Sequence, residues 1–272
     1  MNKTYFFTNG TPRSGSTLIQ NILAQNPKFH ATETSGLLDT LFSIRNTWDK
    51  HIEHQAAPNP DRLQNVLKGI MKGYFDDIEQ NTIFVKSRGI VAYIEFLENI
   101  LEQKIKILVP VRPVIDILTS FEKLYRETVK TRQPPGEAEN YFQFQTVEGR
   151  CEYWLRPDQV VGLSLSRIED SIRRGFRDRL HFIDFNRLTN NPKRTMLEVY
   201  NFLGEEWFEH NFDHVEQVTH EDDNTHGFIG LHTIRNKVEP VKSRALEILG
   251  KDIVQKFQKG TSSEGTLKGA AL

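Results

Sequence analysis

The sequence has very little cysteine and no long apolar run. Cys151 is the only cysteine among 272 residues, so no disulfide can form within the chain. No stretch approaches the roughly 18 uninterrupted apolar residues expected of a membrane-spanning helix, so no membrane span is expected. Met1 is followed almost at once by the first predicted strand, which leaves no room for a signal peptide. These absences predict a cytoplasmic protein.

An excess of charge of one sign is also missing. The chain carries 35 Lys and Arg against 36 Asp and Glu, for a formal net charge of −1. Such a balance gives no electrostatic reason to expect a nucleic-acid partner. No Pro- or Ser-rich linker divides the chain, so we expect one domain over residues 1–259 and a flexible tail over residues 260–272. The oligomeric state cannot be read from the sequence.

Short apolar runs alternate with longer segments in which apolar residues recur at helical spacing. The short runs predict buried strands at residues 4–8, 82–86, 105–111 and 180–185. The longer segments predict helices near residues 18–27, 62–80, 91–101, 113–124, 158–177 and 191–203. Polar or irregular composition predicts loops at residues 46–60, 131–149 and 210–243. This alternation implies an α/β fold with a P-loop-type parallel sheet and helices on both of its faces.

A glycine-bounded loop, residues 10–17 (GTPRSGST), lies between the first predicted strand and the first predicted helix. Strand, loop and helix in this order predict an anion site, because backbone N–H groups and the helix N-terminus can surround a phosphate. The spacing fits a nucleotide-binding P-loop except that Ser16 stands where the lysine is needed. The missing lysine argues against a nucleoside triphosphatase and favours a smaller anionic group. A turn built only from good turn formers is the alternative interpretation.

Three motifs in order resemble those of sulfotransferases that use 3′-phosphoadenosine 5′-phosphosulfate (PAPS). Residues 12–18 (PRSGSTL) resemble the 5′-phosphosulfate loop of that family. Residues 111–120 (VRPVIDILTS) are similar to its 3′-phosphate motif, with an arginine at a strand end and a serine eight residues later. Residues 185–192 (FNRLTNNP), continued by residues 202–204 (FLG), resemble a late motif of the same family. The segment from residue 12 to residue 33 is most similar to the tyrosylprotein sulfotransferases and their bacterial relatives.

The resemblance implies which residues bind PAPS and its product, 3′-phosphoadenosine 5′-phosphate. PAPS carries two separated anionic groups, and the sequence offers two anion sites at predicted strand ends. A late basic loop often closes over the nucleotide in this family, although a solvated charge cluster is the alternative for this chain. The cofactor-binding residues implied are Arg13, Ser14, Gly15, Ser16, Thr17, Leu18, Arg112, Ser120 and Arg235.

Sulfuryl transfer to a hydroxyl also needs a base and a cation at the leaving oxygen. Many cytosolic relatives use a histidine as the base, but this chain has Arg88 at the corresponding position after Lys86 and Ser87. Arginine stays charged and cannot serve as that base. The tyrosylprotein-type members use a glutamate, and Glu33 lies within one residue of that position. The resemblance therefore implies Glu33 as the base and Lys86 as the cation.

Two other functions stay open at this level. A small-molecule kinase would need the missing lysine and an acidic magnesium ligand, and a nucleotide-binding protein without catalysis would need only the loop. The histidines at positions 210, 214, 220 and 226 match no tight ligand spacing, so no metal is expected. The acceptor is expected to carry a hydroxyl, but composition does not identify it as a peptide, sugar, lipid or small molecule.

Overall fold

The fold is built on a parallel sheet whose strands follow in the order β2-β3-β1-β4-β5. The computed structural model describes residues 3–260, without the side chains of residues 259 and 260. β1 lies at the centre, pairing with β3 on one side and β4 on the other. The strands are β1 (Thr4–Thr8), β2 (Phe29–Thr34), β3 (Thr82–Lys86), β4 (Ile107–Val111) and β5 (Leu180–Asp184).

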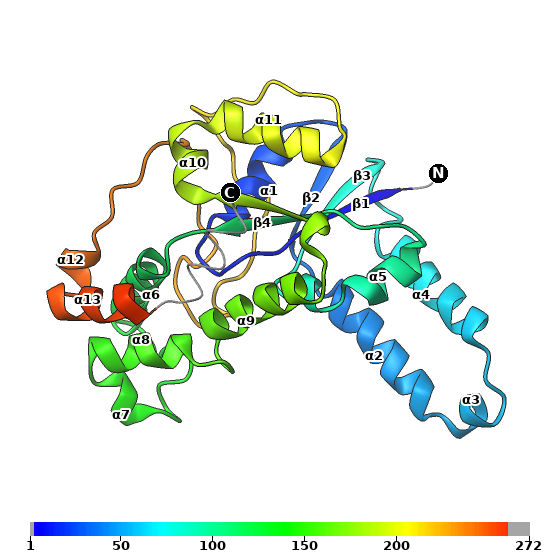
Figure 1. Cartoon of the computed structure of the whole chain (residues 1–272), viewed down its shortest axis with the longest axis horizontal. Coiled ribbons are helices and arrows are strands. Elements are labelled where there is room, and N and C mark those ends of the chain that lie inside the picture. The colour runs from blue at the N-terminus through cyan, green and yellow to red at the C-terminus, as the bar shows by residue number, and fades with distance from the viewer. Residues whose placement is uncertain (1–2, 261–272) are drawn as a thin grey trace.

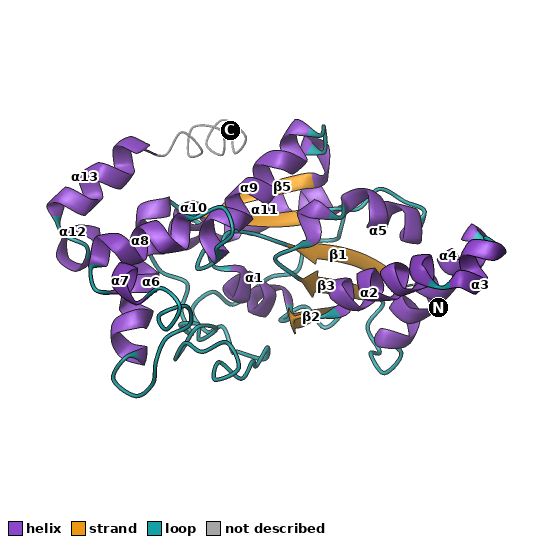
Figure 2. Cartoon of the chain, turned by 90° about the horizontal axis from the view of Figure 1, so that it is seen from below, coloured by secondary structure: helices purple, strands orange, loops and turns teal. Residues whose placement is uncertain are grey.

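Helices cover both faces of this sheet (Figure 1). Figure 2 shows that α2, α3 and α4 gather at one end of the molecule, and α7, α8, α12 and α13 gather at the other. The helices before β4 are α1 (Ser16–Leu23), α2 (Leu37–Lys50), α3 (Ile52–Ala56), α4 (Pro60–Tyr74), η1 (Ile90–Ala92) and α5 (Ile94–Leu101). Those after β4 are α6 (Val114–Thr128), α7 (Tyr141–Phe144), α8 (Val147–Leu155), α9 (Val160–Arg173), η2 (Arg177–Arg179), α10 (Phe185–Asn190), α11 (Pro192–Leu203), α12 (Ala245–Ile248) and α13 (Lys251–Gly260).

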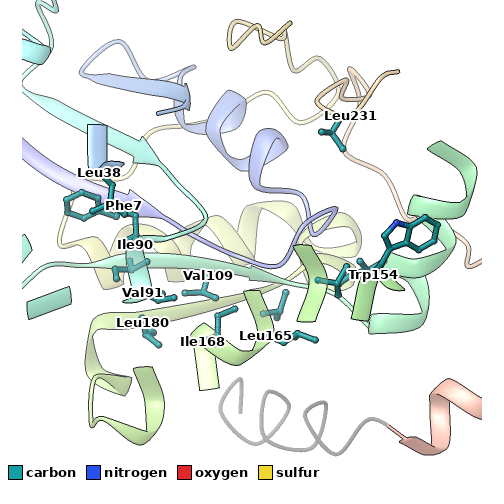
Figure 3. Close-up of a cluster of buried hydrophobic side chains, with 14 of the residues drawn as sticks. Phe7, Leu38, Ile90, Val91, Val109, Trp154, Leu165, Ile168, Leu180 and Leu231 are labelled. Atoms are coloured by element: carbon teal, nitrogen blue, oxygen red, sulfur yellow. The ribbon is translucent and has the colours of Figure 1, made fainter. Parts of the chain in front are cut away.

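Alternating residues of each strand point to opposite faces of the sheet and build two apolar layers. Phe7 of β1 and Val109 of β4 pack toward α2, α5 and α9 in one layer. Figure 3 shows part of that layer, including Leu165 and Ile168 of α9. Phe6 of β1 enters the second layer, which packs against α1 and α11. Burial on both faces explains why the strands read as continuous apolar runs.

The four predicted strands and the α/β fold class are confirmed, but several boundaries differ from the predictions. The strand β2 was not predicted, because its sequence FHATET is polar and lacks a β-branched apolar run. The predicted loop 46–60 was wrong: α2 continues to Lys50, and α3 follows. The predicted loop 131–149 was also wrong in part, since it contains α7 and the start of α8. Pro113 is the N-cap of α6 rather than its first residue.

The loop prediction for residues 210–243 is confirmed, because this segment contains neither helix nor strand. In Figure 1 it runs from α11 past α1 to α12, and the side-chain amide of Asn21 on α1 donates to Thr219 Oγ1 (2.8 Å). Among residues 3–260, no helix combines the length and apolar character required to cross a membrane. Apart from Gly260, the predicted tail lies outside the described residues, and the domain boundary at residue 259 stays a prediction.

Candidate active site

A cleft of about 330 Å³ opens at the carboxyl ends of β1, β3 and β4. From β1 the chain crosses toward β2 at one edge of the sheet, and from β4 it crosses toward β5 at the other edge. Open α/β sheets bind ligands at the point between two such neighbouring strands. The loop 10–17 after β1 lines the cleft, together with Lys86 after β3 and Arg112 after β4. Residues of the late segment 231–244 complete its lining. The fold therefore brings together three groups that are far apart in the sequence.

The backbone of the loop after β1 has the shape of an anion-binding nest. Gly10, Arg13 and Gly15 all have positive φ angles, of 141°, 61° and 94°. A Cβ atom on Gly10 would lie 2.7 Å from the carbonyl oxygen of Pro110, and one on Gly15 would lie 2.7 Å from Cδ2 of Phe185. Both positions therefore require glycine. Alternating left-handed residues turn successive N–H groups toward one side, and the N-terminus of α1 adds its dipole.

The side chains of the loop divide between folding and binding. Ser14 is buried and its hydroxyl donates to the carbonyl oxygen of Pro110 (2.9 Å), so this side chain anchors the loop to β4. Ser16, Thr17 and Leu18 line the cleft, and their role in binding the cofactor stays a prediction. Thr11 Oγ1 is buried and has no hydrogen-bond partner in the part of the chain that the structure describes.

Two arginines meet between the loop and α6. Arg13 Nε donates to Ser120 Oγ (3.0 Å), and its Nη1 donates to the carbonyl oxygen of Leu231. Arg112 stacks over the ring of Phe185, with Cζ 4.7 Å from the ring centre. Burial, followed by the charge of Arg112, lowers the pKa of Arg13 to about 10. Both groups remain charged at neutral pH, so the cleft holds two converging positive charges.

More cations surround this pair on the side of α6. Burial, followed by the charge of Arg244, lowers the pKa of Lys123, and the charges of Arg235 and Arg112 act in the same direction. The charge of Arg235 also lowers the pKa of Arg112, after the larger effect of burial. Lys123, Arg235 and Arg244 all line the cleft. Within the described residues, the buried Nε of Arg112 lacks a hydrogen-bond partner. Cations held this close together favour a bound anion.

Lys86 forms a buried ion pair at the other end of the cleft. Its Nζ donates to Glu221 Oε1 (2.7 Å) and to Thr17 Oγ1 (3.3 Å). The two charged side chains are only 6% and 7% exposed. Burial acts to raise the pKa of Glu221, but the hydrogen bond and charge of Lys86 outweigh it, and the pKa falls to about 2. Glu221 is therefore ionised at neutral pH and holds Lys86 next to the loop.

Two histidines lie on the other side of Glu221. His226 Nε2 and His232 Nε2 are each 3.4 Å from Glu221 Oε2. These three residues bring one ligand atom each within 4.8 Å of one another, a separation that suits a metal ion. However, the ammonium of Lys86 already occupies Glu221 Oε1 and would repel a cation. The contacts favour an ion-pair network, and the absence of a metal stays a prediction.

Glu33 lies outside this arrangement. It is on β2, its side chain is exposed, and it lines a smaller hollow together with His30 and Tyr74. Its neighbour Thr34 lines the main cleft instead. The charge of Glu33 raises the pKa of Lys86, against the larger lowering by burial, which places the two side chains within electrostatic range. The role of Glu33 as base stays a prediction.

The sequence interpretation missed three side chains that the structure places at the site. Lys123 lies one helical turn after Ser120, a spacing that could have indicated it. Thr11 was part of the predicted anion loop but was not assigned a role. Glu221 gave no signal, because it comes from an irregular segment 135 positions after Lys86.

Comparisons with known proteins agree with this geometry. The sequence profile described as "Sulfotransferase family" matches residues 6–209. No curated protein matches the chain significantly. The fold is similar to the sulfotransferase domain from the curacin biosynthetic pathway, with a TM-score of 0.54, 14% identity, and coverage of 96% of this chain and 98% of that one. It is also similar to the sulfotransferase domain from the Synechococcus PCC 7002 olefin synthase, with a TM-score of 0.53, 18% identity, and coverage of 95% and 94%.

The structural likenesses show the fold, and the profile match shows the family, because it covers most of the chain. The match includes the loop after β1, Lys86 and Arg112. The profile match decides against the kinase interpretation. It is consistent with the presence of Ser16 where a P-loop kinase has its lysine. We conclude that this chain belongs to the sulfotransferase family.

Proposed function

We propose that this sulfotransferase uses PAPS as its donor and transfers the sulfuryl group to a hydroxyl by in-line displacement. The observation that supports this most is the pair of anion sites in one cleft. The nest after β1 meets α6, which follows Arg112, where Arg13 Nε donates to Ser120 Oγ (3.0 Å). PAPS carries its 5′-phosphosulfate and its 3′-phosphate on one nucleoside, so two neighbouring sites match it.

Unsatisfied polar atoms fit the same ligand. Arg112 Nε and Thr11 Oγ1 are both buried without a protein partner among the described residues. Buried donors left without partners are unfavourable by about 1–3 kcal/mol each. Phosphate oxygens would satisfy both. The cleft volume of about 330 Å³ is in the range of small-molecule sites.

In this proposal the loop holds the 5′ end of the donor. The N–H groups from Arg13 to Leu18 surround the phosphosulfate, and the hydroxyls of Ser16 and Thr17 line its path. The side chain of Ser14 supports the loop rather than the ligand.

The 3′-phosphate is proposed to lie at the start of α6. Arg112, Ser120 and Arg235 line the cleft there, and Lys123 adds a further positive charge. Asp116 also lines this side and accepts from Ser243 Oγ (2.5 Å), so its carboxylate is partly satisfied by the protein.

Lys86 is proposed to stabilise the charge that develops on the leaving phosphate oxygen. Its contact with Thr17 Oγ1 (3.3 Å) places the ammonium beside the loop that holds this group. The loop, Lys86 and the arginines supply the positive charge that a metal ion supplies in kinases, so no metal is required. The cytoplasm remains the proposed location, and the acceptor is a hydroxyl compound of undetermined class.

The test is a comparison of two nucleotides by calorimetry and thermal unfolding. 3′-Phosphoadenosine 5′-phosphate at 100 times its dissociation constant should stabilise the protein by about 2.7 kcal/mol. Adenosine 5′-phosphate should bind far more weakly because it lacks the 3′-phosphate. The variant Arg112→Gln should narrow that difference, whereas Arg62→Gln on the exposed surface of α4 is the matched control. Equal affinity of the wild-type protein for both nucleotides would contradict the two-site proposal.

A further inference from the structure

His232 is held in one orientation by Asp223. Its Nδ1 lies 2.7 Å from Asp223 Oδ1, and its main-chain N–H donates to Asp223 Oδ2 (3.1 Å). A carboxylate at Nδ1 requires the proton on that nitrogen, so the neutral ring presents a lone pair at Nε2. The His232 side chain is 12% exposed and lines the main cleft. The ring therefore offers a fixed proton acceptor at the cleft wall.

Glu221 connects this histidine to Lys86. Its Oε2 faces His232 Nε2 at 3.4 Å, while its Oε1 accepts from Lys86 Nζ (2.7 Å). The same Oε1 also accepts from the main-chain N–H and the hydroxyl of Thr34, each at 3.0 Å. The pKa of Glu221 falls to about 2, so its carboxylate is ionised at neutral pH and is a poor base. It is well placed to stabilise an imidazolium on His232.

The charged and titratable groups that face His232 are Glu221, Asp223, Lys86 and His226. Burial lowers the pKa of His232, and Lys86 acts in the same direction, while Asp223 and Glu221 raise it. The ring of His226 lies 4.9 Å away, centre to centre. The ring of His232 is consequently neutral at pH 7, and two carboxylates flank it if it gains a proton. In a Ser-His-Asp triad the aspartate likewise orients the histidine and stabilises its protonated form.

We propose that His232 is the general base of the sulfuryl transfer and that Asp223 is its positioning residue. This inference rests on the proposed use of PAPS. In the step, the acceptor oxygen forms a bond to sulfur while the bond between sulfur and the bridging oxygen of the 5′-phosphate breaks. The hydroxyl proton moves to His232 Nε2, and the electron pair of the broken bond stays on the phosphate oxygen beside Lys86. The proton then leaves His232 to water, and 3′-phosphoadenosine 5′-phosphate departs.

This assignment gives Glu33 no part in proton transfer. Glu33 is exposed on β2 and lines a different hollow, whereas His232 and Lys86 line the same cleft. In an in-line displacement the base and the leaving-group cation lie on opposite sides of one sulfur atom, so they must be near each other. Glu221 contacts both Lys86 and His232 and so holds them near each other. The geometry thus favours His232 over Glu33 as the base.

The first experiment reads the tautomer and does not depend on the acceptor. The protein, labelled with ¹⁵N-histidine and saturated with 3′-phosphoadenosine 5′-phosphate, is studied by NMR, and His232→Gln identifies the signal. We expect the Nδ1–H tautomer at neutral pH in the wild-type protein and its loss in Asp223→Asn. A dominant Nε2–H tautomer in the wild-type complex would overturn the proposal, because the lone pair would then lie on Nδ1 against Asp223, and Nε2 could not accept a proton.

The second experiment measures transfer from [³⁵S]PAPS to phenol and to the more acidic p-nitrophenol, or to water if neither phenol reacts. His232→Gln should lower turnover with phenol by about 10²–10⁴-fold. It should lower turnover with p-nitrophenol less, since that hydroxyl needs less help from a base. Asp223→Asn should lower turnover without changing KM. His220→Gln, an exposed histidine of the same segment, is the matched control, and its turnover should stay within about twofold of wild type.

Calorimetry with 3′-phosphoadenosine 5′-phosphate separates the possible failures. His232→Gln should bind it with unchanged affinity and melt as a folded protein. If the wild-type protein does not bind it, the proposed function fails. If it binds and His232→Gln transfers sulfate at the wild-type rate while Glu33→Gln does not, the base assignment alone is overturned.

Discussion

Replacing Lys86 by methionine should lower both the stability of the protein and its rate of sulfuryl transfer. Lys86 and Glu221 are 6% and 7% exposed and form a 2.7 Å ion pair. The uncharged methionine would leave the Glu221 carboxylate buried without its main partner. Removing one member of a buried ion pair typically destabilises a protein by about 3–5 kcal/mol. We expect a loss of that size in the free energy of unfolding.

A second substitution separates the structural role of Lys86 from its catalytic role. Glu221→Gln removes the charge that Lys86→Met leaves unpaired, so the double variant should regain most of the lost stability. The coupling energy from the double-mutant cycle should be at least about 2 kcal/mol, because the two side chains touch. Urea unfolding of the four proteins measures it directly.

Transfer should not recover along with stability. The double variant still lacks the cation at the leaving oxygen, and loss of one such group typically lowers turnover by about 10²–10³-fold. The matched comparison is with Glu221→Gln alone, which keeps Lys86 and differs from the double variant only at that position. Additive stability losses would refute the buried pair, and equal turnover in those two proteins would refute the role of Lys86.

Three further outcomes are expected. Gly15→Ala should weaken binding of 3′-phosphoadenosine 5′-phosphate by about tenfold or more, because φ is 94° there and the new Cβ would lie 2.7 Å from Phe185; unchanged affinity in calorimetry would argue against the nest. Transfer should persist in excess EDTA, and loss of activity restored by a divalent metal would contradict the metal-free site. Burial lowers the pKa of His210 from 6.5 to about 4. Between pH 6.5 and pH 4 the unfolded chain therefore binds a proton at His210 that the folded chain does not bind. The contribution of this group to the free energy of unfolding should be complete above pH 6.5 and fall by up to about 3 kcal/mol toward pH 4. Urea unfolding should show a flatter pH dependence in His210→Phe, and an unchanged slope would contradict this assignment.

Most of the fold could be predicted from the sequence because the central strands are buried on both faces. β1 and β4 are short and mostly apolar, as expected of strands that are buried on both faces of a parallel sheet. The strand β2 escaped prediction because it pairs with a single neighbour, β3, and carries polar side chains. Its position is decided by tertiary pairing rather than by its own pattern.

The glycine-bounded loop and Arg112 of the candidate site were equally visible in the sequence, whereas Glu221 and His232 were not assigned to it. Anion loops have fixed local spacing, so the sequence alone places Gly15 in the loop before α1 and Thr17 in its first turn. Arg112 was found because it directly follows the apolar run of β4. Glu221 and His232 come from a segment without helix or strand, and only its path past α1 brings them to Lys86. No local pattern encodes that approach.

The central claim is that this chain moves a sulfuryl group from PAPS to a hydroxyl. The most direct measurement incubates the wild-type protein with [³⁵S]PAPS and a panel of phenols, sugars, peptides and alcohols. Labelled ester and 3′-phosphoadenosine 5′-phosphate are then counted in the same sample. The account predicts one nucleotide released for each labelled ester, with both lost in Lys86→Met. Tight binding of 3′-phosphoadenosine 5′-phosphate without labelled product from any acceptor would instead indicate a nucleotide-binding protein without catalysis and would contradict the account.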